Sequence, residues 1–167
     1  MQLNQQTDYA LRILMLLAKE ERAAQKTHTP TPRLVTIREI AEFHGISKNH
    51  LMKIVNKLAE HGIVHAQRGH KGGLRLEESG LNMRVGDIVR LMEGGWQMAA
   101  CFSIDGKCPI QSSCQLQQAL YRALNAFWTE LDQYTLGDMI EPKSKPEAVL
   151  IQKIRHINEA ARTFNAI

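Results

Sequence analysis

Two short amphipathic patterns joined by a glycine-containing turn constrain the fold of this chain more than any other feature of its sequence. In the first, Ile37, Ile40 and Ala41 lie on one side of a short helix, and Gly45 can supply a left-handed turn after it. In the second, positions 51, 54, 55 and 58 are apolar at helical spacing, behind Ser47, which suits an N-cap. Two such helices predict a helix-turn-helix, a unit that places its second helix in the major groove of DNA.

A basic, glycine-rich hairpin is predicted directly after these helices. Residues 63–66 and 73–76 can each form a short strand, with residues 67–72 as the tip between them. Because the tip carries Arg68, His70 and Lys71, we expect it to form a wing that approaches the minor groove or the DNA backbone.

The remaining patterns are helical. Apolar spacing predicts helices over residues 4–20, 85–93 and 115–134, whereas residues 21–36 are polar, contain two prolines and suit an inserted loop. The helix over 115–134 would be about 30 Å long, and its narrow apolar seam needs a partner, most simply a second copy of the chain. The fold class predicted is mainly α: a winged helix-turn-helix domain plus a long dimerisation helix, with a two-stranded β wing.

The chain divides accordingly into four predicted parts. They are residues 1–78, the winged helix-turn-helix domain with its inserted loop at 21–36; residues 79–114, a linker helix and cluster-binding loop; residues 115–140, the dimerisation helix; and residues 141–167, a C-terminal helical extension.

The positive charge of the chain lies in the predicted DNA-binding segment. The formal net charge is +4, and residues 37–76 hold seven Lys and Arg against three Glu, so this segment accounts for the whole excess. A solvated polar face is the ordinary alternative for each residue, although Asn49 suits an adenine and Lys53 and Lys57 suit phosphates. The candidate DNA-binding residues are Ser47, Lys48, Asn49, His50, Lys53, Lys57, Arg68, His70 and Lys71.

Three cysteines in a polar loop form the candidate metal site. Cys101, Cys108 and Cys114 fall within fourteen residues, and thiolates are preferred ligands of iron in clusters and of zinc. No signal peptide or membrane-length apolar run is seen, so we expect a cytoplasmic protein without membrane contact, where an odd number of cysteines disfavours disulfides. Zinc sites usually show a closely spaced cysteine pair, which this loop lacks, and unrelated buried cysteines are a further alternative. An iron-sulfur cluster is favoured, and its fourth protein ligand must be oxygen or nitrogen.

These motifs together resemble a known family. Residues 6–12, 37–41, 45–51 and 68–73, followed by the cysteine triplet, are similar to the bacterial iron-sulfur winged-helix transcription regulators, and most of all to the nitric-oxide-sensing repressors among them. The resemblance implies a homodimer that binds double-stranded operator DNA, responds to nitric oxide and carries an iron-sulfur cluster, with [4Fe-4S] favoured over [2Fe-2S]. It also implies that Asp8 of the partner subunit is the fourth ligand, although an acid near a helix N-terminus can equally be a solvated residue.

Other details bear on that resemblance. Cluster-biogenesis regulators have a histidine shortly after the third cysteine, where this chain has Gln117. Arg12 can pair with Asp8 at i, i+4 as a switch contact or as an ordinary surface pair. The alternatives left open are a regulator that senses iron or cluster supply and a redox or electron-transfer protein. No nucleophile–base pair or phosphate loop is seen, so no enzyme is expected.

Overall fold

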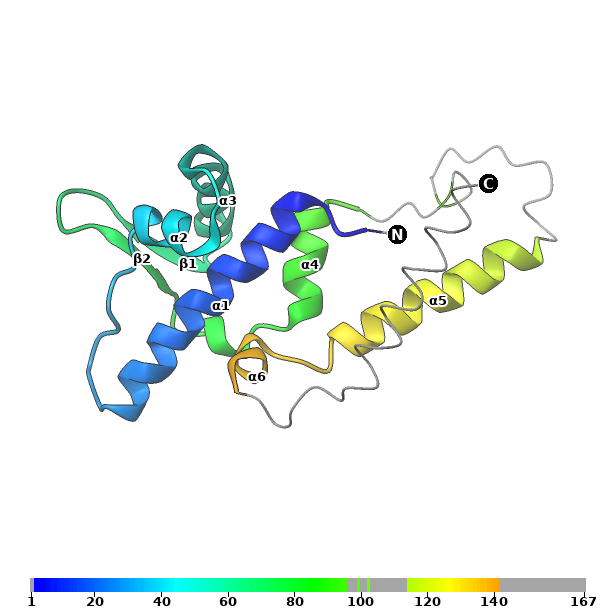
Figure 1. Ribbon diagram of the computed structural model, residues 1–167. Coiled ribbons are helices and arrows are strands. Elements are labelled where there is room, and N and C mark those ends of the chain that lie inside the picture. The colour runs from blue at the N-terminus through cyan, green and yellow to red at the C-terminus, as the bar shows by residue number, and fades with distance from the viewer. Residues whose placement is uncertain (1, 96–98, 100–101, 103–113, 142–167) are drawn as a thin grey trace.

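The computed structural model describes residues 2–95, 99, 102 and 114–141 and shows a helical body with one hairpin. Its elements are α1 (Gln5–Lys26), α2 (Ile37–His44), α3 (Lys48–Glu60), β1 (Val64–Gln67), β2 (Gly73–Leu76), the 3-10 turn η1 (Gly80–Asn82), α4 (Val85–Glu93), α5 (Gln115–Leu131) and α6 (Leu136–Ile140). Figure 1 shows α2, α3 and the hairpin on one side of α1, and α4 and α6 near its other side. This arrangement confirms the predicted winged helix.

The long helix α1 forms the centre of the core. Its buried face includes Ile13, Leu14 and Leu17, each at most 1% exposed. The expected end of this helix near residue 20 is wrong, because α1 continues to Lys26. Residues 21–26 include two alanines, which are strong helix formers, and Ala24 is buried. The inserted loop is therefore shorter than predicted.

The turn between the two helices of the helix-turn-helix lies at its predicted signals, Gly45 and Ser47, and a capping box that was not predicted begins α2. Thr36 and Glu39 form a reciprocal capping box at the start of α2. Gly45 ends that helix with φ of 66°, a left-handed conformation that favours glycine. The Ser47 hydroxyl then caps α3 by accepting a hydrogen bond from the His50 N–H at 3.4 Å.

The wing is a two-stranded antiparallel hairpin that is anchored to the body. Val64 pairs with Leu76 and Gln67 with Gly73, so the first strand lies one residue later than predicted. Val35 adds an isolated bridge to Leu74, with N–H···O distances of 2.9 and 2.8 Å. The end of the predicted inserted loop is thus hydrogen-bonded to the wing. This pairing joins residues far apart in the chain, so no local sequence pattern indicates it.

The C-terminal part of the described chain differs most from the prediction. The helix expected over 115–134 ends at Leu131, and the separate helix α6 follows. Leu136 of α6 is fully buried in the core cluster around α1, so the chain returns to the DNA-binding domain. The helix α4 also belongs to this body, because Ile88 is fully buried in the same cluster. The predicted extension over 142–167 lies outside the described residues.

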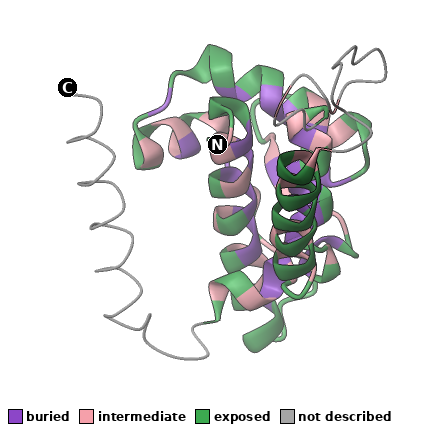
Figure 2. Cartoon of the chain, turned by 90° about the vertical axis from the view of Figure 1, so that its right-hand side faces the viewer, coloured by how far each residue is buried: buried purple, intermediate pink, exposed green. Residues whose placement is uncertain are grey.

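Most of α5 remains exposed. Figure 2 shows its surface largely in the colour of exposed residues, and Leu124 is its one buried residue among those described. Leu116 and Tyr121 are apolar side chains that are 66% and 57% exposed. Among the described residues, no helix is both long and apolar enough to cross a membrane.

Candidate nucleic-acid interface and cluster site

The outer face of α3 is the first part of the candidate DNA interface. Its inner face is fixed to the core by Leu51, Ile54, Val55 and Leu58, none more than 3% exposed. The opposite face carries the candidate DNA-binding residues of α3, and the one carboxylate of this helix belongs to its last residue, Glu60. Burying one face while exposing the other leaves a cationic surface in the position of a recognition helix. Exposed here are Ser47, Lys48, Asn49, His50 and Lys53, with Lys57 half-buried.

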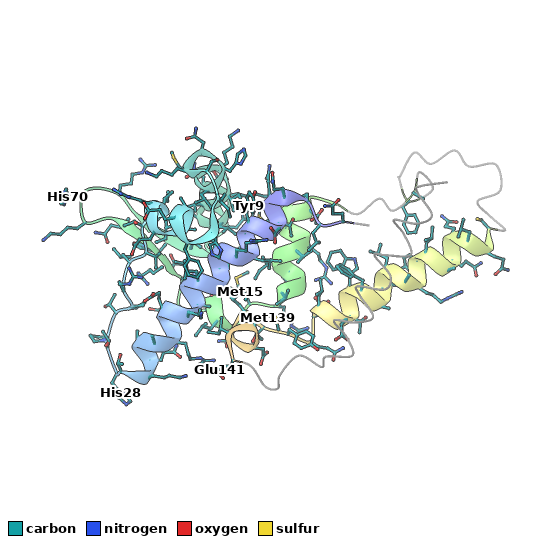
Figure 3. The ribbon with its side chains drawn as sticks, in the orientation of Figure 1. Tyr9, Met15, His28, His70, Met139 and Glu141 are labelled. Atoms are coloured by element: carbon teal, nitrogen blue, oxygen red, sulfur yellow. The ribbon has the colours of Figure 1, made fainter. Side chains whose placement is uncertain are left out.

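The tip of the wing is the second part of this interface. Arg68, His70 and Lys71 are exposed, and Figure 3 shows His70 at the far end of the hairpin. The turn depends on its glycines: a Cβ at Gly72 would lie 2.3 Å from the Gln67 carbonyl oxygen, so only glycine fits. The backbone can therefore fold tightly enough to present three basic side chains on a narrow tip.

Asp8 and Arg12 lie together near the N-terminal end of α1. Their side chains form an i, i+4 ion pair, with Arg12 Nη2 2.9 Å from Asp8 Oδ2 and Nε 3.1 Å from Oδ1. Both are nearly half exposed, so the pair is accessible to solvent and contributes little to stability. They line a groove of about 610 Å³ that continues to His44 and Gly45 at the helix-turn-helix. Burial, and then the nearby charge of Arg12, lowers the pKa of His44 and so favours its neutral ring.

Cys114 is the described member of the cysteine triplet. It is the N-cap of α5, and its Sγ accepts a hydrogen bond from the Gln117 N–H at 3.4 Å. The sulfur thus lies at a helix N-terminus, where free N–H groups suit an anionic group, so the position fits a sulfur ligand of a metal centre. Cys114 forms no disulfide and is half-buried.

The structure describes only part of the predicted ligand set. Cys101 and Cys108 lie outside the described residues. Within the described part of the chain, no three His, Cys, Asp or Glu side chains form a group that could hold a metal ion. The cluster assignment therefore depends on the donor chemistry of three thiolates and on the position of Cys114.

One ion pair could not be predicted from the sequence, because its members are far apart in the chain. Arg90 of α4 and Asp132, which follows α5, form two hydrogen bonds, from Nη1 at 2.8 Å and from Nη2 at 2.6 Å. This pairing raises the pKa of Arg90 and lowers that of Asp132. A separation of 42 residues leaves no local pattern from which it could be found.

The fold and its basic face define the class: this is a winged helix-turn-helix transcriptional regulator. Residues 3–142 match the model of the Rrf2 family, described as an iron-dependent transcriptional regulator. The chain therefore belongs to the Rrf2 family. This membership agrees with the predicted class of transcriptional regulator.

Solved structures of related proteins support the same fold. The oxidized form of Staphylococcus aureus CymR is 27% identical with a TM-score of 0.64, and the match covers 87% of this chain and 100% of that one. A transcriptional regulator from Listeria innocua is 26% identical with a TM-score of 0.66, covering 89% and 92%. IscR of T. potens, at 22% identity and a TM-score of 0.62, covers 90% and 96%, and at that identity the likeness shows the fold alone.

Proposed function

We propose that this chain is a nitric-oxide-responsive transcriptional repressor of the NsrR type, which binds operator DNA as a homodimer under the control of an iron-sulfur cluster. The position of Cys114 carries this proposal. As the N-cap of α5, Cys114 attaches a cluster ligand to the end of a long, exposed helix suited to pairing with its copy. Occupancy of the site and the orientation of α5 are therefore physically linked.

The proposed ligands are Cys101, Cys108 and Cys114, with Asp8 of the partner subunit as the fourth. Three thiolates leave one iron of a [4Fe-4S] cluster without a cysteine, and a carboxylate is a weaker and more exchangeable ligand than a thiolate. The cluster, when bound, supplies iron that reacts with nitric oxide. Asp8 is suited to an exchangeable role because it is half-buried and has an alternative partner on its own helix.

Arg12 is that alternative partner and provides the proposed switch contact. The ion pair at 2.9 Å neutralises the Asp8 carboxylate when the carboxylate is not engaged elsewhere. An exposed i, i+4 pair is worth only a few tenths of a kcal/mol, so Arg12 can release Asp8 at small energetic cost. The pair thus gives Asp8 two accessible states without creating a buried unpaired charge.

The DNA-binding residues divide into two roles. Asn49, near the start of α3, is placed to read a base, whereas Lys53, Lys57 and the wing cations neutralise phosphates. The cluster-bound shape must bind the operator better than the cluster-free shape, and a 100-fold preference corresponds to about 2.7 kcal/mol. The resemblance to the nitric-oxide-sensing repressors implies that the target genes serve nitric-oxide detoxification.

Titration of the anaerobic protein with nitric oxide tests this function. Operator affinity, measured by gel shift with competitor DNA at a stated salt concentration, should be lost at a few nitric oxide molecules per cluster. Binding that resists nitric oxide but is lost on iron chelation would identify a sensor of iron or cluster supply instead. No specific DNA binding in either state would favour an electron-transfer protein. The Cys114→Ser variant should resemble the nitric-oxide-treated protein, whereas Ser113→Ala in the same loop should not.

A further inference from the structure

The two ends of α5 are attached to the rest of the chain in very different ways. At its N-terminal end, Cys114 leads back into the predicted cluster loop. At its C-terminal end, residues 132–136 are joined to the body by backbone bonds: the Val85 N–H donates to the Tyr134 carbonyl at 2.9 Å, and the Leu136 N–H to the Met83 carbonyl at 2.8 Å. Figure 1 shows α5 leaving the body beside α6 and extending away from α1. The helix is therefore anchored at one end.

A compact set of side chains reinforces this anchor. Arg90 holds Asp132 through two parallel hydrogen bonds at 2.8 and 2.6 Å, and its guanidinium lies 4.5 Å from the centre of the Trp128 ring. A planar guanidinium that is both paired to a carboxylate and stacked on an indole has little rotational freedom. The set is partly solvated, with Arg90 39% and Asp132 28% exposed, so its main effect is on orientation rather than on stability.

Gly86 shows how closely α4 approaches this anchor. A Cβ added at Gly86 would lie 1.9 Å from Asp132 Oδ1, so the carboxylate occupies the space that any other residue would fill. Gly86 lies in the first turn of α4 and does not have a positive φ, so backbone conformation does not require glycine there. Its benefit at this position is the close approach of the Asp132 side chain to the helix.

We propose that Arg90 and Asp132 form the pivot through which a change at the Cys114 end of α5 reorients the DNA-binding domain. This inference rests on the proposed function. The 17 residues of α5 span about 25 Å. If the joint at the pivot is rigid, a displacement of roughly 2 Å at Cys114 turns α5 and the attached body together by about 5°. Because α4 packs on α1, and α1 on α3, a rigid pivot turns that displacement into a rotation of the recognition helices in the dimer. Arg90 and Asp132 are positioning residues and touch neither cluster nor DNA.

The test compares operator dissociation constants with the cluster bound and after its removal, in the full-length dimer. Wild-type protein should show a ratio of about 100. Asp132→Asn removes the charge of the pivot, and Gly86→Ala displaces the same carboxylate by steric contact without changing any charge. Each should lower the ratio to below about 10, with unchanged cluster content and dimerisation. Asp87→Asn is the matched control: it removes another carboxylate bonded to Arg90, at 3.1 Å, that lies within α4 and does not reach α5.

The outcomes separate the pivot from the proposed function. A ratio that stays near 100 in folded, cluster-containing Asp132→Asn or Gly86→Ala protein would overturn the pivot, as would an equal fall in Asp87→Asn. A wild-type ratio near one contradicts the proposed function instead. In that case, hydrogen exchange at the Val85 and Leu136 amides decides the pivot: faster exchange in both test variants but not in Asp87→Asn supports it, and unchanged exchange rejects it.

Discussion

The salt dependence of operator binding follows from the cations on the candidate interface. Each chain presents Lys48, Lys53, Lys57, Arg68 and Lys71 on α3 and the wing, so a dimer has ten such charges available. If six to ten of them neutralise phosphates, affinity should fall by about 10³ to 10⁵ between 50 and 200 mM salt. The logarithmic slope of that fall counts the phosphate contacts directly.

Replacement of a single lysine sharpens this prediction. Lys53→Gln removes two charges per dimer and should make the slope shallower by about 2, which is close to a tenfold smaller loss over the same range. Lys26→Gln is the matched control, because Lys26 ends α1 beside His28, which Figure 3 places away from the wing tip. Fluorescence anisotropy with a labelled operator at four salt concentrations measures both slopes. Equal slopes for wild type and Lys53→Gln would refute this assignment of the α3 face.

Two further predictions concern stability. Leu136→Ala should lower the free energy of unfolding by about 3 kcal/mol, because it leaves a cavity at a fully buried site where α6 meets the core. Met139→Ala, at an exposed site in the same helix, should change that free energy by less than about 0.5 kcal/mol. Equal urea-denaturation midpoints for the two variants would contradict the packing described. The hydrogen bond from the Thr36 backbone N–H, and then the one from Arg33, lower the pKa of Glu39 to about 2. The ionised Glu39 therefore stabilises the fold fully at a pH above its ordinary pKa of 4.5, and this stabilisation is lost as the pH falls toward 2. Thermal melts at pH 7 and pH 3 should therefore show a smaller loss of stability on acidification in Glu39→Gln than in wild type or in Glu42→Gln, and parallel losses in all three would exclude the capping box as the cause.

The parts of the fold set by neighbouring residues could be predicted from the sequence. Gly45, Ser47 and the apolar face of α3 lie within fifteen residues of one another, and their helix signals agree with the structure. The candidate DNA-binding surface followed from the same pattern, because burying one helix face leaves the other to solvent.

The parts set by distant residues could not be predicted. The long helix α5 ends where Asp132 meets Arg90, and α6 forms where Leu136 enters the core, although five residues have little helical tendency by themselves. The pairing of Val35 with Leu74 fixed part of the supposed loop for the same reason. For the proposed cluster site, the sequence supplied three candidate thiolate ligands, but a fourth ligand proposed to come from a second chain leaves no local pattern.

The most direct test of the cluster assignment is the metal and sulfide content of the protein purified without oxygen. The account predicts a coloured protein with iron and acid-labile sulfide in equal amounts, about four of each per chain for a [4Fe-4S] cluster. It also predicts that both are lost together in Cys114→Ser. A colourless protein that carries one zinc per chain and no sulfide would contradict the central claim.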